Sequence, residues 1–172
     1  MNNKTNEVDG FRFMPPSLGA SIGKDIPKED YQGDIPWTSL KKPIEQTRFA
    51  LMTTAGISMK SDTPFNVERE RQEPLWGDPT FREIPRATTE ADIEVNHLHI
   101  NTDYIYQDLN VMLPLARFRE FEIDGFIGSL APTSYSYYGY QMDPKVLLEE
   151  TMPKVSDKML SEGVEAVILT PA

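Results

Sequence analysis

The chain has 172 residues, of which 39% are hydrophobic and 26% charged, a composition typical of one soluble globular domain. Its net charge of -10 at pH 7 opposes binding to nucleic acid or to an anionic membrane, because both require clustered Lys and Arg. The lack of Cys excludes disulfides, thiolate metal sites and a Cys nucleophile among these residues.

The N-terminal residues show no apolar signal core, and no segment approaches the length of a membrane span, so we expect a cytoplasmic protein. Frequent Pro and Gly in residues 1–46 exclude long regular elements and predict an extended arm. An α/β domain then occupies residues 47–172. The arm has four candidate anchors, Phe11, Phe13, Tyr31 and Trp37.

The first predicted strand spans residues 48–56, an apolar run that ends in small residues and Gly. Residues 57–91 contain many Pro and little periodicity, which predicts an irregular stretch with one short strand at 80–84. Residues 93–100 alternate as a half-buried strand, with a change of apolar parity that indicates a bulge.

The second half alternates strands and helices. Pro114 begins a helix that runs to about Asp124 and stops at Gly125. Residues 126–131 form a strand, and residues 132–140 an aromatic loop that either contacts a ligand or caps the sheet edge.

The last predicted helix begins at Asp143 and Pro144 and ends at Gly163. Pro153 should divide it, and Thr151 is then placed to cap its second part. Its apolar residues recur at helical spacing and indicate a buried face. They are Leu148, Met152, Val155 and Met159.

Residues 164–170 form the final strand, so the order from residue 126 to 170 predicts a right-handed βαβ unit. We therefore expect an α/β fold, with a three-layer, Rossmann-like, mostly parallel sheet and a long irregular N-terminal arm. A parallel strand is normally followed by a crossover helix. The predicted domain is thus C-terminally incomplete at Ala172.

His97 and His99 form an H-x-H pair on one side of a predicted strand, a spacing at which two imidazoles can share a metal. The simpler explanation of the pair is a solvated strand face, because a third ligand would be an arbitrary choice among Glu94, Asp103 and Asp108. We predict no metal site and rank a single His acting as acid or base only slightly above a shared metal. The sequence contains no phosphate-binding Gly motif and no Ser nucleophile elbow.

Seven blocks carry a family resemblance: Trp37-Thr38-Ser39-Leu40-Lys41-Lys42-Pro43, Phe49-Ala50-Leu51-Met52-Thr53-Thr54-Ala55-Gly56-Ile57, Gly77-Asp78-Pro79-Thr80-Phe81-Arg82-Glu83-Ile84-Pro85, Asp108-Leu109-Asn110-Val111, Ile127-Gly128-Ser129-Leu130-Ala131-Pro132-Thr133, Leu148-Glu149-Glu150-Thr151-Met152-Pro153-Lys154 and Leu169-Thr170-Pro171-Ala172. In this order they resemble the selenoprotein B subunits of the glycine, sarcosine, betaine and D-proline reductases. The resemblance covers about residues 36–172 and leaves the preceding Pro-rich arm unexplained.

In that family, the strand that corresponds to residues 164–170 leads into a selenocysteine, or into a Cys in some relatives. The domain then continues with another helix and strand. Selenocysteine is encoded by UGA, ordinarily a stop codon. The resemblance therefore implies a frame that continues beyond Ala172 and a nucleophile that lies outside these residues.

The chemistry implied by the resemblance is reductive cleavage of a carbon–nitrogen bond. A selenolate attacks the α-carbon of glycine, sarcosine, betaine or D-proline. A pyruvoyl group on a separate partner subunit activates the substrate nitrogen, and a thioredoxin-like or other dithiol donor reduces the selenium centre. The substrate among these four is left open.

With the nucleophile outside the chain, we assign no catalytic residue within it and expect only substrate-binding roles near the strand ends. The candidate substrate-binding residues are Thr54, Gly56, His97, Asp108, Asn110, Thr133, Ser134 and Tyr135.

A second hypothesis is a noncatalytic α/β domain that binds a small molecule or a protein. The codon after Ala172 separates the two hypotheses, because only the reductase predicts UGA followed by an open frame. We also expect the apolar residues of the final strand to promote self-association.

Overall fold

The computed structural model describes residues 16, 17, 20 and 38–172. The chain divides into two compact units, residues 1–38 and 39–172, and the second unit holds the sheet. The predicted anchors of the arm, Phe11, Phe13, Tyr31 and Trp37, lie outside the described residues. The described part contains no helix with the length and apolar character needed to cross a bilayer.

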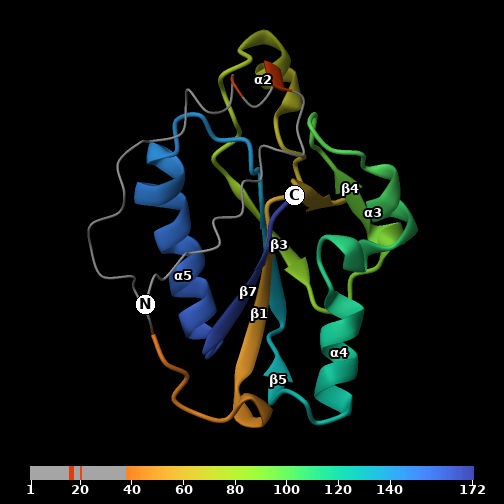
Figure 1. The fold of residues 1–172 in the computed structure, drawn as a ribbon, viewed down its shortest axis with the longest axis vertical. Helices are drawn as coiled ribbons and strands as arrows, with labels where there is room; N and C mark the ends of the chain where they lie inside the picture. The colour runs from red at the N-terminus through yellow and green to blue at the C-terminus, as the bar shows by residue number, and fades with distance from the viewer. Residues whose placement is uncertain (1–15, 18–19, 21–37) are drawn as a thin grey trace, which may run out of the picture. The chain divides into compact units, whose positions relative to one another are not determined.

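The second unit is built on one mixed, mostly parallel sheet with helices on both faces (Figure 1). The strands of the main sheet are β1 (Arg48–Thr53), β3 (Phe81–Pro85), β5 (Ser129–Leu130), β6 (Thr133–Tyr137) and β7 (Ala166–Thr170). A two-stranded sheet pairs β2 (Ile57–Met59) with β4 (Ile93–Val95). The helical elements are η2 (Ile44–Gln46), α2 (Val67–Gln72), η3 (Glu90–Asp92), α3 (Asp103–Gln107), η4 (Leu109–Val111), α4 (Leu115–Ile123), η5 (Leu147–Thr151) and α5 (Met152–Ser161).

Strand β1 is the centre of the main sheet. It pairs in parallel with β7 over residues 49–53, and with β5 and then β6 on its other side. The register changes from Phe49 opposite Leu130 to Met52 opposite Tyr135, so β5 and β6 are one interrupted strand along β1. Strand β3 pairs with β6 antiparallel. The predicted α/β fold with a mostly parallel sheet is confirmed.

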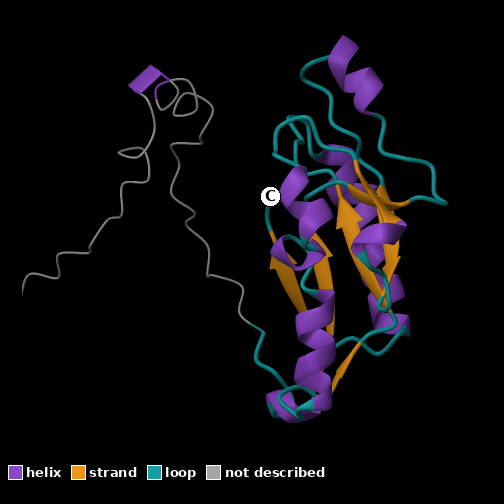
Figure 2. Cartoon of the chain, turned by 90° about the vertical axis from the view of Figure 1, so that its right-hand side faces the viewer, coloured by secondary structure: helices purple, strands orange, loops and turns teal. Residues whose placement is uncertain are grey.

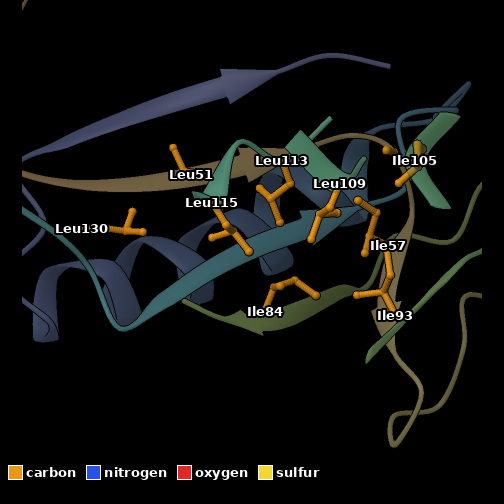
Figure 3. Packing of buried hydrophobic residues seen from close by; sticks show 10 residues of the cluster. Leu51, Ile57, Ile84, Ile93, Ile105, Leu109, Leu113, Leu115 and Leu130 are labelled. Carbon is orange, nitrogen blue, oxygen red and sulfur yellow. The ribbon is translucent and has the colours of Figure 1, made fainter. Parts of the chain in front are cut away.

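Alternation along β1 sends its side chains into two cores, one on each face of the sheet. Leu51 packs with residues of η4 and α4, including Leu109 and Leu115 (Figure 3). Ala50 and Met52 face the other way and pack with Val155 and Met159 of α5. Helices therefore lie on both sides of the strands (Figure 2). The sheet is therefore the middle layer of three, as the sequence predicts.

Strand β1, strand β3, helix α4 and strand β7 occupy the predicted positions. Helix α4 follows Pro114 and ends before Gly125, which has a φ of +74° that disfavours any residue with a Cβ. Gly163 likewise follows α5 with a φ of +71°. These stops were predictable because they depend on backbone conformation local to each glycine.

The helix before β7 is divided at the predicted place, but by a π-helical turn, η5, that runs directly into α5. Pro153 has no N–H to donate, and a wider turn accommodates it without ending the helix. The wider turn changes which residues face the sheet: Leu147 is buried, whereas the predicted Leu148 is 61% exposed. The predicted cap at Thr151 is also wrong, because its hydroxyl donates to the Pro79 carbonyl at 2.6 Å.

Two further predictions are corrected by the pairing of strands. The segment 132–140, expected to be a loop, contains β6, whose small polar residues are buried because β1 and β3 pair with it on both sides. The strand expected at 93–100 ends at Val95, because its partner β2 has only three residues. The stretch 57–91, expected to be irregular apart from one strand, also contains β2 and α2.

Candidate functional site

The carboxyl ends of β1, β6 and β7 meet at Thr54. The Thr54 amide donates to the Thr170 carbonyl at 3.2 Å, and the Gly139 amide donates to the Thr54 carbonyl at 2.9 Å. The Ala172 amide donates to the Thr54 hydroxyl oxygen at 2.7 Å. Since ligands of α/β sheets bind beyond the carboxyl ends of the strands, this junction is the candidate site.

Two glycines permit close approach of the backbone at this edge. A Cβ at Gly139 would lie 2.8 Å from the Thr54 Cβ. Gly56 has a φ of +63°, and a Cβ there would lie 2.5 Å from the Asn96 carbonyl oxygen. The predicted residues Thr54 and Gly56 thus lie together at the edge, and Gly56 turns the chain from β1 into β2.

A buried carboxylate lies beside the same edge. Glu70, on α2, has a side chain that is 3% exposed, and it accepts a hydrogen bond from the Tyr138 hydroxyl. Its other oxygen is 2.5 Å from His99 Nε2. The hydroxyl of Tyr138 also accepts from the Leu98 amide at 3.3 Å. Burial, and then the hydrogen bond to Glu70, raise the pKa of Tyr138, so this phenol stays protonated at neutral pH.

The predicted residue His97 belongs to this cluster. Its ring stacks on Tyr138 with centroids 4.5 Å apart, and its Nδ1 accepts from the His99 amide at 3.1 Å. Burial and the nearby His99 lower the pKa of His97, although Glu70 acts in the opposite direction. His97 is therefore a neutral imidazole at pH 7, with Nδ1 as acceptor and Nε2 protonated.

The two histidines do not converge on one point. Their rings are edge to face at 5.8 Å, and each uses one ring nitrogen in a hydrogen bond within the cluster. Among the residues described, no group of three or more His, Asp or Glu is arranged to hold a metal ion. The geometry is that of a hydrogen-bonded network.

Asp108 and Asn110 lie at η4, where their polar atoms serve the backbone. Asp108 accepts from the Asn110 amide at 2.9 Å, and hydrogen bonds with Asn110 lower the pKa of its carboxyl. Asn110 accepts from the Ala116 amide at 2.9 Å and so supports the start of α4. The Met112 carbonyl, just after η4, accepts from the Thr170 hydroxyl at 2.5 Å. Asp108 and Asn110 therefore stabilise η4 and the start of α4. Met112, between these two elements, contacts the end of β7.

Thr133, Ser134 and Tyr135 are the first three residues of β6, and Tyr135 lies opposite Met52 of β1. The Thr133 hydroxyl donates to Glu162 at 2.6 Å. Ser134 and Tyr135 are fully buried, and within the described part of the chain their hydroxyls have no hydrogen-bond partner. Among the described residues, none of these three hydroxyls bonds to Thr54, Gly56 or His97.

A hollow of about 690 Å³ lies at the opposite end of the sheet. It is open, and its lining includes Arg48, Ser129 and Glu165, near the amino ends of β1, β5 and β7. Glu165 in this lining is 2.7 Å from the Lys42 ammonium and accepts from the backbone amide of Arg48 at 3.2 Å. Self-satisfied polar groups at amino ends of strands make this hollow a poor candidate site.

Glu70, Tyr138 and His99 are not among the residues that the sequence predicts for the site. Glu70 lies in the run Glu68-Arg69-Glu70-Arg71, which is indistinguishable from a solvated helix face. Tyr138 and His99 belong to motifs that were singled out, the aromatic segment and the H-x-H pair. Tyr138 and His99 lie 68 and 29 residues from Glu70 along the chain, so only the fold brings the three side chains together.

Two comparisons with known proteins give matches. Residues 26–172 match the family model described as glycine/sarcosine/betaine reductase selenoprotein B. The chain is 36% identical over 153 residues to the D-proline reductase subunit gamma of Acetoanaerobium sticklandii. This aligned region covers 87% of the chain and 60% of that protein. The chain therefore spans about 60% of the length of this relative. No solved structure matches the chain significantly.

The fold and its edge define an α/β protein with a mostly parallel, three-layer domain and a polar cluster beyond the carboxyl ends of its strands. Because the family model covers most of the sequence, the chain belongs to the glycine/sarcosine/betaine reductase selenoprotein B family. The resemblance inferred from the sequence blocks is confirmed.

Proposed function

We propose that the chain is the N-terminal part of a selenoprotein B type reductase subunit. The reaction is reductive cleavage of the carbon–nitrogen bond of glycine, sarcosine, betaine or D-proline, with electrons from a dithiol donor. The observation that carries this proposal is the family match over residues 26–172. The junction at Thr54 supports it, because ligands of α/β sheets bind beyond the carboxyl ends of the strands that meet there.

The nucleophile in this proposal is a selenocysteine, or a Cys, that follows Ala172. When present, it supplies the anion that attacks the substrate α-carbon. A pyruvoyl group on a partner subunit would activate the substrate nitrogen. Within the chain, the Thr54 hydroxyl accepts from the Ala172 amide at 2.7 Å and would hold this segment at the strand edge.

Within the chain, Thr54, Gly56 and His97 are proposed to line the substrate pocket. Gly56 brings the backbone to the edge, and neutral His97 presents a protonated Nε2 to a polar group of the substrate. Asp108 and Asn110 are proposed to act indirectly, by bracing the segment that holds Thr170. Thr133, Ser134 and Tyr135 support the strand and have no proposed contact with substrate.

The gene gives the sharpest test. The codon after that of Ala172 should be UGA, followed by an open frame that encodes an amphipathic helix and a Val- and Ile-rich strand. Protein from the native host should contain selenium by mass spectrometry and exceed 19.6 kDa. A UAA or UAG codon without a continuing frame would contradict the proposal and favour a noncatalytic binding domain.

An activity assay then tests the division of roles. The 172-residue chain, mixed with partner subunit and a dithiol donor, should not turn over any of the four substrates, because it lacks the nucleophile. The full-length subunit should turn over at least one of them under the same conditions. Turnover by the 172-residue chain would show that the nucleophile has been misplaced.

A further inference from the structure

Helix α4 lies beside β5 and ends in a turn that folds an aromatic residue back onto it (Figure 1). The Phe126 amide donates to the Phe121 carbonyl at 2.8 Å, and the positive φ of Gly125 makes this reversal possible. The rings of Phe121 and Phe126 are then edge to face, with centroids 6.1 Å apart. Such a contact is usual where a helix ends in this way, so it accounts for the pairing of the two rings. It does not account for the apolar surface around them.

An apolar groove of about 330 Å³ lies beside this turn, near the amino end of β1. All of its lining residues are apolar: Ile44, Phe49, Phe118, Phe121, Phe126 and Ile127. Three of them are well exposed, Phe126 at 63%, Ile44 at 50% and Phe121 at 41%. Ile123, the last residue of α4, is 83% exposed. The end of α4 thus combines an apolar hollow with an apolar side chain that is free to enter another surface.

The size of this surface suits a protein interface. At about 200 Å² for a side chain of this size, the exposed fractions of Ile44, Phe121, Ile123 and Phe126 leave on the order of 500 Å² of apolar surface. A standard interface buries about 800 Å² on each partner and has an apolar centre within a polar rim. These four side chains therefore supply more than half of what one side of a stable dimer needs.

The charges of α4 favour a second copy of the chain as the occupant. The chain has a net charge of -10 at pH 7, so two copies repel each other unless they meet where charge is balanced. Helix α4 carries two Arg and two Glu, and all four bond within the chain. Arg117 is 2.8 Å from Glu120. Glu122 pairs with Arg86, whose carbonyl accepts from Arg119. Two copies can therefore meet along this helix with little repulsion.

We propose that the apolar groove and Ile123 form a two-fold interface between two copies of this chain, in which Ile123 of each copy enters the groove of the other. In a two-fold contact, one patch must be complementary to itself. The end of α4 meets this condition, because it offers both the inserted side chain and the hollow that receives it. The interface would form whether or not the chain is part of a reductase.

The first test is sedimentation velocity of the 172-residue chain carrying Leu169→Lys, which weakens association through the edge of β7. This variant should still show a monomer–dimer equilibrium at micromolar concentration. Adding Ile123→Lys should raise the dissociation constant at least about tenfold, because an ammonium group loses its hydration in an apolar groove. The substitution should leave the fold intact, since Ile123 is mostly exposed, and circular dichroism checks this.

The matched control is Leu75→Lys in the same background. Leu75 is 72% exposed and does not line the groove, so its substitution should leave the dissociation constant unchanged. A chain that is already monomeric with Leu169→Lys alone would overturn the inference. An equal loss of association in the Leu75→Lys and Ile123→Lys variants would also overturn it, because it would show general apolar adhesion.

The second test locates the contact without altering the groove. Because the chain has no Cys, Asp124→Cys provides a single site for a nitroxide label next to Ile123. When this labelled chain is mixed with ¹⁵N-labelled chain, both carrying Leu169→Lys, intermolecular broadening should be strongest at the amides of the groove residues. Broadening centred on β7, or spread evenly, would refute the two-fold interface. If the chain is monomeric and the groove amides shift only when the reductase partner subunit is added, that subunit is the occupant and a second copy is excluded.

Discussion

Strands β6 and β7 flank β1 on opposite sides and run parallel to it, yet their surroundings differ sharply. The three central residues of β6 are buried, whereas in β7 Val167, Ile168 and Leu169 are 38%, 36% and 65% exposed. Strand β6 has a second neighbour, β3, while β7 pairs only with β1 among the described residues. Equal pairing to β1 therefore does not give equal burial, which depends on what lies beyond each strand.

The pairing of Leu51 with Ile168 offers the strongest test of this contrast, because it compares the core of the sheet with its edge. Leu51→Ala should lower the free energy of unfolding by about 2–5 kcal/mol, since the side chain is fully buried among Leu109, Leu115 and other residues. Ile168→Ala, at the edge, should cost less than about 1.5 kcal/mol. Urea denaturation of both variants measures the difference, and equal losses would refute it.

The exposed edge of β7 should also drive association. An edge strand with unpaired backbone groups and apolar side chains is a template for pairing with another chain. We expect the 172-residue chain to self-associate at micromolar concentration, and Leu169→Lys to weaken this at least about tenfold, or about 1.4 kcal/mol. Sedimentation velocity gives the association constant.

Leu160→Lys is the matched control for that experiment, because Leu160 is 70% exposed but lies on α5. An equal effect of the two substitutions would show general apolar adhesion in place of pairing through β7. A strictly monomeric chain would contradict the expected association altogether.

The smallest expected effect concerns the buried side of the comparison. The Tyr135 hydroxyl in β6 is buried without a partner among the described residues, so Tyr135→Phe should be neutral or stabilise the chain by up to about 1 kcal/mol. Thermal denaturation at pH 7 provides the measurement. Tyr135→Leu, which changes the shape of the side chain, is the control and should destabilise the chain.

The same phenol should make stability depend on alkaline pH. Burial, with the nearby Glu162 and Glu83, raises the pKa of Tyr135 to about 12, from 10.0 for an ordinary tyrosine. The unfolded chain therefore loses this proton first, and stability falls as pH rises from about 10 through about 12. Tyr135→Phe should show a shallower decline over that range. Parallel declines would place the responsible group elsewhere.

Several elements could be predicted from sequence because their signals are local. The apolar run of β1, the Pro114 start and Gly125 end of α4, and the Val- and Ile-rich β7 each carry their own evidence within a few residues. The edge residues Thr54 and Gly56 followed from the end of β1. The family itself was also recognisable, since its blocks are contiguous and ordered along the chain.

Other features required the tertiary structure. Strand β6 reads as a loop because Thr133-Ser134-Tyr135-Ser136-Tyr137 has no apolar pattern, and only pairing with β1 and β3 buries it. Strand β4 ends early because β2 is short. Glu70 has the local surroundings of a solvated residue, and only the packing of α2 brings it to Tyr138 and His99. Sequence alone therefore determined the family and those elements whose signals are local. Long-range contacts decided the remaining elements and which polar residues are buried together, because burial depends on neighbours distant along the chain.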